Sequence, residues 1–297
     1  MNKRKNIYRG MNRRRNNTAK VISLGLVIAC IAGGVIFVKK SDFSIAEKIS
    51  NLNFLSKKNT SIQEFSYDDV VDKNNKSKDK QAEVKNEDAK VATVENFDIY
   101  SIQIAAIDNQ AELDKIENKL NELKIPFSIV EIDSIKKVQT YASFTEEESR
   151  KHLDSIKKDF EDAFISKLEV PLLGLQYTEK YVYVEDICKE INNLITNFKE
   201  ESKIWDKGDE GIDKEKYKNI INSRLETLSK LEKHAKSINY EGMKGFKENL
   251  LTYTKSIEDK SKESLNKVEQ DKNYVGESLF ISSMQGYYSF VNSIKTI

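Results

Sequence analysis

IYSIQIAAIDNQAELDKIENKLNELKIPFSIV, residues 99–130, opens the stretch Ile99–Glu169 that decides the fold of this chain. Apolar residues alternate at Tyr100, Ile102 and Ile104, which is typical of a strand with one buried face. The spacing then becomes helical, with apolar side chains at Leu113, Ile116, Leu120 and Leu123. A second strand is predicted at Phe127–Ile132, so the first half of the stretch has the order strand, helix, strand.

The second half of the stretch repeats this order. It predicts a strand at Val138–Tyr141, a helix at Thr145–Phe160 and a strand at Ala163–Leu168. Polar residues with capping-box spacing precede both helices, namely Asn109 with Glu112 and Thr145 with Glu148. Two such halves predict an α+β domain of βαββαβ order, over residues 97–177, with the helices on one face of an antiparallel sheet.

The other face of this sheet is expected to be open. Alternation directs Tyr100, Ile102 and Ile104 toward the helices and leaves Ser101 and Gln103 on the open face. Two interpretations remain for the later strand. Alignment from Phe144 places Gln139 and Tyr141 on the helix-facing side, whereas polarity places Gln139 outside.

The stretch resembles the SPOR domains, a family of small peptidoglycan-binding domains. The family pattern is V-Q-hydrophobic-G-x-F, and the chain reads Ile102-Gln103-Ile104-Ala105-Ala106-Ile107 in the first half and Gln139-Thr140-Tyr141-Ala142-Ser143-Phe144 in the second. Gln103 and Phe144 match the pattern. The family's glycines are replaced by Ala105 and Ala142, and Ile107 stands where an aromatic residue is expected.

This resemblance implies that the open sheet face contacts peptidoglycan glycan strands, in particular strands stripped of their stem peptides. Sugar recognition favours amide and hydroxyl groups that pair with sugar hydroxyls, and an aromatic ring that lies against the sugar's C–H face. Ser101, Gln103, Gln139 and Tyr141 have the suitable chemistry and are the candidate glycan-binding residues.

A membrane anchor is expected before this domain. Residues 1–20 carry eight Lys or Arg side chains and no acid, and the 18 residues Val21–Val38 carry no charge. As a helix this run is about 27 Å long, which suits a bilayer core of about 30 Å. The basic arm keeps the N-terminus cytoplasmic, so a single-pass protein with its later domains outside the cytoplasm is predicted. This interpretation is preferred over nucleic-acid binding by the arm.

Two alternatives to an uncleaved anchor concern the apolar run, and its small residues raise a separate question of dimerisation. A cleaved signal peptide requires a shorter run and a small-residue site, which Phe37-Val38-Lys39-Lys40 does not supply. Cys30 follows a sequence that resembles a lipoprotein cleavage box, but the residues after it stay apolar. Gly25, Ala29 and Gly33 lie four residues apart on one helix face, a spacing that allows a homodimer through close helix pairing.

Residues 39–96 are expected to form a disordered linker. The tract from Asp72 to Lys90 is almost wholly polar and cannot bury enough apolar surface to offset the entropy of ordering. A coil of this length spans roughly 40 Å on average, so it would lift the α+β domain clear of the lipid headgroups.

Residues 178–297 predict an antiparallel helical bundle. Apolar stripes of helical period run through Tyr181–Phe198, Tyr217–Leu231, Met243–Val268 and Tyr274–Val291. Breaks fall at residues 208–211 and 238–242, whereas a break near Asp271–Asn273 is left open, so the third and fourth helices could be continuous. The aromatic residues near the C-terminus belong to the core or form a surface for a protein partner.

No catalytic constellation is found in the sequence. The two histidines, His152 and His234, fall in different expected domains, which does not suit a zinc amidase or peptidase. Cys188 lies on the apolar side of a helix and has no His partner. Muramidases need only two carboxylates, but the acids here lie among lysines, as in Lys230–Lys236. No nucleotide fingerprint occurs. We expect no enzyme, no metal and no cofactor.

The sequence therefore predicts a membrane-anchored, non-catalytic protein that binds peptidoglycan glycan strands at the division or sporulation septum. The order of arm, anchor, linker and SPOR-like domain resembles that of membrane proteins of this family, although here a long helical region follows the domain. The alternative is a membrane-tethered scaffold whose bundle recruits a protein partner and whose α+β domain no longer binds glycan.

Overall fold

The computed structural model describes residues 90–207 and 211–295, all of which belong to one compact unit. The basic arm, the apolar run Val21–Val38 and the linker up to residue 89 lie outside the described residues. No helix in the described part of the chain is both long and apolar enough to cross a membrane.

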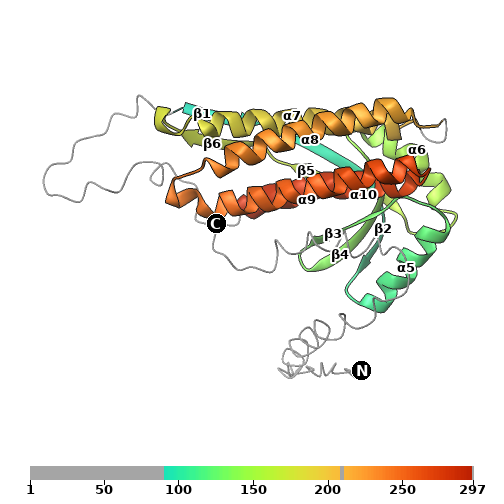
Figure 1. The fold of residues 1–297 in the computed structure, drawn as a ribbon. Coiled ribbons are helices and arrows are strands. Elements are labelled where there is room, and N and C mark those ends of the chain that lie inside the picture. The colour runs from blue at the N-terminus through green and yellow to red at the C-terminus, as the bar shows by residue number, and fades with distance from the viewer. Residues whose placement is uncertain (1–89, 208–210, 296–297) are drawn as a thin grey trace, which may run out of the picture. The chain divides into compact units, whose positions relative to one another are not determined.

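The α+β fold expected from the sequence is present, with antiparallel sheets. Its elements are β2 (Phe97–Ile107), α5 (Gln110–Glu122), β3 (Ser128–Ile132), β4 (Ile135–Ser143), α6 (Glu146–Ile156) and β5 (Phe164–Val170). The four strands form one sheet of order β3-β4-β2-β5 (Figure 1). The Asn109 side chain accepts a hydrogen bond from the backbone N–H of Glu112 at 2.9 Å, so the expected cap begins α5.

A second, two-stranded sheet extends the main one. It pairs β1 (Lys90–Val94) with β6 (Leu173–Tyr177), and both strands contact α7 (Tyr183–Trp205). Residues 90–94 were expected in the linker, and that expectation is wrong. Ala92 and Val94 alternate with exposed residues and are buried in the main hydrophobic cluster, which stabilises a strand next to a polar tract.

Four long helices complete the described chain. They are α7, α8 (Lys214–Lys236), α9 (Lys244–Glu269) and α10 (Asn273–Lys295), with short 3-10 helices η2 (Glu179–Tyr181) and η4 (Glu241–Met243) before α7 and α9. Consecutive long helices lie side by side in Figure 1. Asp271 has a positive φ of 59° between α9 and α10, so the third and fourth predicted helices are separate.

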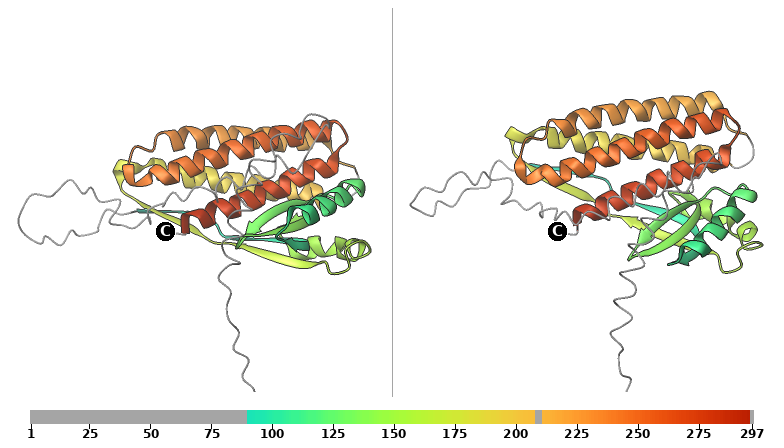
Figure 2. Two further views of the ribbon diagram at one scale, coloured as in Figure 1. Left: turned by 90° about the horizontal axis from the view of Figure 1, so that it is seen from below. Right: turned by 60° about the horizontal axis from the view of Figure 1, so that its bottom comes forward.

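Helix α10 is buried on nearly all sides. Figure 2 shows it, in red, between the other long helices and the strands, and it contacts β3, β4 and β5 as well as α9. No charged residue occurs between Glu277 and Lys295, so the helix has no face suited to solvent. The sheet face that was expected to be open is therefore covered, and that expectation is corrected.

The sheet and the helices share one hydrophobic core. Phe97 and Ile99 of β2 belong to the same cluster of buried residues as Phe198 of α7 and Tyr287 of α10. The rings of Phe97 and Tyr287 stack with their centroids 5.8 Å apart. Two smaller clusters surround Leu120 of α5 and Ile156 of α6 in residues 97–170, which we call the α+β half. The Leu120 cluster also contains Val275 and Leu279 of α10.

Candidate functional site

Residues 101–104 of β2 place polar and apolar side chains on opposite faces of the sheet. Ile102 is fully buried in the cluster that contains Ile156 of α6, and Ile104 is packed against the same cluster. Ser101 and Gln103 alternate with these residues and therefore point to the opposite face, as the sequence predicts. That opposite face is the one that α10 covers.

The strand register gathers further polar residues on this face. Gln103 lies opposite Gln139 of β4, and Gln139 lies opposite Ser128 of β3. Ser101 lies opposite Ser166 of β5. Directly opposed residues share a face of the sheet, and the Gln139 amide donates a hydrogen bond to the Ser166 hydroxyl at 3.3 Å. We call these five residues the polar face.

Helix α10 meets the polar face with polar side chains of its own. Ser278, Ser282 and Gln285 are spaced at i, i+4 and i+7, which places them on one stripe of the helix. The Phe127 backbone N–H donates to the Ser278 hydroxyl at 2.9 Å, and the Gln285 amide donates to the Gln139 carbonyl oxygen at 2.7 Å. Side-chain hydrogen bonds therefore link the sheet to the helix.

The polar face is deeply buried but incompletely hydrogen-bonded. Ser101, Ser128 and Gln139 have no exposed surface, and Gln103 is 7% exposed. The hydroxyls of Ser101 and Ser128 and the side-chain oxygen of Gln285 have no hydrogen-bond partner among the described residues. Buried polar groups are normally paired, and each one left unpaired costs about 1–3 kcal/mol. The contact between α10 and the polar face is therefore poorer than an ordinary core contact.

A buried amine lies beside this stripe. Lys260 of α9 is 5% exposed and donates a hydrogen bond to the Ser282 hydroxyl at 2.8 Å. Burial lowers the pKa of the Lys260 amine from 10.5 to about 7, because the charged form is poorly solvated there. Near neutral pH the amine is therefore divided between its charged and neutral forms.

Tyr141 does not join the other three candidate residues. It has a positive φ of 47° at an irregularity in the pairing of β2 with β4. Its ring stacks on the His152 ring of α6, with centroids 4.0 Å apart and planes at 6°. Gln139 therefore lies on the face that its polarity predicted, and Tyr141 lies on the face of the sheet that α6 covers. The glycan-binding roles of Ser101, Gln103, Gln139 and Tyr141 stay predictions.

The sequence interpretation missed Ser128 and Ser166 on the sheet and Ser278 and Gln285 on α10. The two sheet serines follow only from the strand register, which a single sequence does not determine. The α10 residues could have been predicted from the sequence. Polar side chains at helical spacing in a run without charged residues indicate a buried polar contact.

A second buried polar cluster lies inside the helical bundle. The guanidinium of Arg224 on α8 forms an ion pair with Glu201 on α7, and both side chains are almost fully buried. Arg224 also donates to the Asn197 side-chain oxygen at 2.7 Å, and Tyr217 and Trp205 donate to Glu201 at 2.9 and 3.1 Å. Each charge is thus compensated, which suits a role in the specificity of helix packing.

Burial changes the titration of one thiol and of two carboxyl groups among the described residues. Burial raises the pKa of the Cys188 thiol to about 12, so the thiol stays protonated and is a poor nucleophile. No group of His, Cys, Asp or Glu side chains in this part of the chain is placed to hold a metal ion. Burial also raises the pKa of Glu117 on α5 to about 7 and that of Asp206, after α7, to about 6.

Comparisons with family models, with curated proteins and with solved structures find no match to this chain.

Proposed function

We propose that this chain is a membrane-anchored, non-catalytic protein that binds peptidoglycan glycan strands through the polar face of its sheet, at a division or sporulation septum. The observation that supports this proposal best is the gathering of amide and hydroxyl side chains from four strands on one face. A glycan strand presents hydroxyl and acetamido groups, which are the natural partners of such side chains.

The order of the elements gives further support. The βαββαβ order of the elements is the order that the SPOR resemblance implies. Many unrelated functions occur on sheets of this kind, so the proposal rests on the polar face and not on the topology. The anchor at Val21–Val38 and the septal location come from the sequence and remain part of the proposal.

A scaffold role is the second candidate function. It is favoured by the cover that α10 places over the polar face, because in this arrangement a glycan strand cannot reach Gln103 or Gln139. In that case the α+β half would be a structural part of the bundle, and a protein partner would bind elsewhere. The exposed side chains of Val91 on β1 and of Leu172, just before β6, would be tested first as part of such a contact.

Co-sedimentation with sacculi distinguishes the two functions. The full chain, in mild detergent, is mixed with sacculi before and after an amidase has removed the stem peptides. The proposal predicts binding that increases on stripped glycan and is weakened by Gln103→Ala. Gln176→Ala, on the exposed side of β6, is the matched control and should bind like the parent. Equal, negligible sedimentation with both preparations would reject glycan binding and favour the scaffold.

A further inference from the structure

We propose that the contact between α10 and the sheet is reversible, and that the α+β half turns away from the helices about two adjacent chain connections to uncover the polar face. This inference deepens the proposed function, since the uncovered face would be the glycan-binding surface. The opening breaks only contacts within the chain, and it can be measured without any ligand.

The contact that α10 covers contains both apolar and polar side chains. Tyr287, in the C-terminal half of α10, stacks on Phe97, whereas Ser278 accepts a hydrogen bond from the Phe127 backbone N–H and Gln285 donates to the Gln139 side chain. Ser101 and Ser128 are completely buried there with unpaired hydroxyls. A contact selected only for stability would place apolar groups at such positions. The polar face therefore has the chemistry of a surface that also meets a polar partner.

Two short chain connections join the α+β half to the rest of the described chain. Residues 95–96 join β1 to β2, and residues 171–172 join β5 to β6. Val94 pairs with Leu173 and Phe97 pairs with Val170, so the two connections lie opposite each other. No strand pairing is present between these pairs, and Pro171 has no N–H to donate. Two short unpaired connections at one place form a natural hinge.

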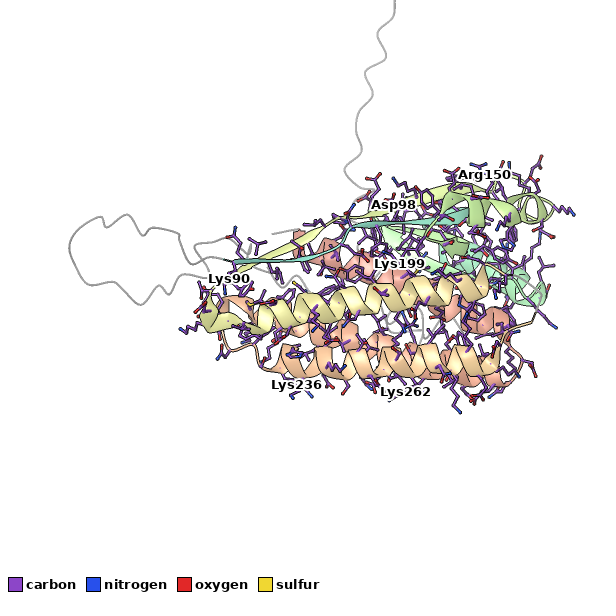
Figure 3. The ribbon with its side chains drawn as sticks, turned by 90° about the horizontal axis from the view of Figure 1, so that it is seen from above. Lys90, Asp98, Arg150, Lys199, Lys236 and Lys262 are labelled. Atoms are coloured by element: carbon purple, nitrogen blue, oxygen red, sulfur yellow. The ribbon has the colours of Figure 1, made fainter. Side chains whose placement is uncertain are left out.

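One side of this hinge is fixed to the helices. The Asn192 side chain of α7 donates to the Thr93 carbonyl at 2.9 Å and accepts from the Glu95 N–H at 3.0 Å. Lys199 of α7, labelled in Figure 3, forms an ion pair with Glu95 at 2.7 Å. The two-stranded sheet therefore stays with α7 when the main sheet moves.

The distance of each contact from the hinge, measured along β2, determines which contact breaks first. Phe97 is adjacent to the hinge and packs in the main core, whereas Ser101 and Gln103 lie four and six residues further along the strand. At about 3.3 Å per residue, the polar face is roughly 13–20 Å from the hinge. A rotation about the hinge therefore displaces the polar face, and the contacts of α10 with the Leu120 cluster, further than it displaces Phe97.

Opening has a cost that keeps the covered form in excess. Val275 and Leu279 of α10 belong to the cluster that contains Leu120 and Phe127 of the α+β half, and they must leave it. The Gln139–Gln285 hydrogen bond must also break. A glycan strand would then compete with α10 for the same face, so its apparent affinity would be reduced by the fraction of molecules that are open.

Thiol labelling measures the opening directly. In the full chain with Cys30→Ser and Cys188→Ala, Ser101→Cys replaces a fully buried, unpaired hydroxyl by a near-isosteric thiol. Ser261→Cys is the matched control, because Ser261 of α9 is also buried with an unpaired hydroxyl but is not on the polar face. Each thiol is reacted with N-ethylmaleimide under native conditions.

The inference predicts labelling at Ser101→Cys at least about tenfold faster than at Ser261→Cys, since local opening needs less free energy than global unfolding. Ser128→Cys, on β3, is a second reporter and should label at a similarly fast rate. Adding Gln285→Leu, which removes a hydrogen bond of the covered form, should increase the rate at Ser101→Cys several-fold. Equal rates at the three sites, matching the global unfolding rate, would overturn the inference.

The labelling experiment and the sacculus experiment test the opening and the glycan binding separately. Fast labelling without sedimentation would leave the hinge in place and reject glycan as the ligand. Sedimentation by a chain whose reporter thiols label only on global unfolding would show that glycan binds elsewhere and would overturn the opening.

Discussion

The side-chain amide of Gln285 donates a hydrogen bond of 2.7 Å to the side-chain oxygen of Gln139, across the contact between α10 and β4. The two residues are 146 positions apart in the chain, and both are buried. Gln139 in turn donates to Ser166, so it is bonded through both ends of its amide. This hydrogen bond joins amide side chains of α10 and of the sheet, and its loss has a defined cost.

Gln285→Leu should destabilise the folded chain by about 1–3 kcal/mol, because it leaves the buried oxygen of Gln139 without a donor. The measurement is the free energy of unfolding in urea. Gln176→Leu removes an amide of the same size from the exposed side of β6 and should change stability by less than about 0.5 kcal/mol.

Replacing both glutamines tests the cause of this loss. Gln139→Leu with Gln285→Leu removes both partners, so the double variant should be more stable than the sum of the single changes predicts. Additive losses would mean that the two amides do not interact in the folded state.

Arg224→Met should have a larger effect, of about 3–5 kcal/mol, because it leaves the carboxylate of Glu201 buried without its ion-pair partner. Thermal or urea unfolding measures this loss. Arg150→Met is the matched control, since Arg150 forms an ion pair with Glu146 on the exposed surface of α6 and should cost at most about 1 kcal/mol. Similar losses for both variants would contradict the described burial of Arg224.

Lys260 should make stability depend on pH above neutrality. Its pKa is about 7 in the folded chain and near the ordinary 10.5 in the unfolded chain. Between these values the unfolded chain binds more protons at this site, so the free energy of unfolding should rise with pH, by up to about 1.4 kcal/mol per unit. Below about pH 7 both states are protonated, and the full cost of burying the charge remains.

The matched comparison isolates this contribution from other titrations. Lys260→Met should be more stable than the parent below about pH 7, and its advantage should shrink as the pH approaches 10. Lys262→Met removes an exposed lysine from the same helix and is the matched control for the loss of a lysine side chain. A difference between Lys260→Met and the parent that stays constant between about pH 7 and 10 would show that the Lys260 amine is solvated.

The fold was predictable where local signals agree. Alternation along β2 and the caps at Asn109 and Thr145 define the order of the α+β elements, because strand period and capping act within a few residues. The cover by α10 was not predictable in this way. Its contact with the sheet joins residues such as Phe127 and Ser278, which are 151 positions apart, and no local pattern specifies which face a distant helix will occupy.

The residues of the candidate site were likewise predictable only where the strand pattern is regular. Ser101 and Gln103 were assigned to the correct face because β2 keeps its alternation there. Tyr141 could not be assigned, since the irregular pairing at its positive φ changes the face on which the following side chains lie. Strand β1 was missed because only Ala92 and Val94 bury apolar surface in a segment next to a polar tract.

The end of α5 offers a substitution that should increase stability. Lys124 is exposed and has a positive φ of 53°, and the Ile125 N–H donates to the Leu120 carbonyl at 2.9 Å, which is the pattern of a helix that ends in a left-handed residue. Glycine adopts this conformation without steric cost. Lys124→Gly should therefore stabilise the chain by about 0.5–1 kcal/mol.

Lys115→Gly is the opposite control on the same helix. Lys115 is exposed in the interior of α5, where glycine should cost about 1 kcal/mol through the greater entropy of the unfolded chain. The two variants change the same residue type to the same product, so the difference in sign of the free energy of unfolding depends on backbone conformation alone. If both variants lose stability by the same amount, Lys124 does not have a left-handed conformation and α5 does not end where the structure places its last turn.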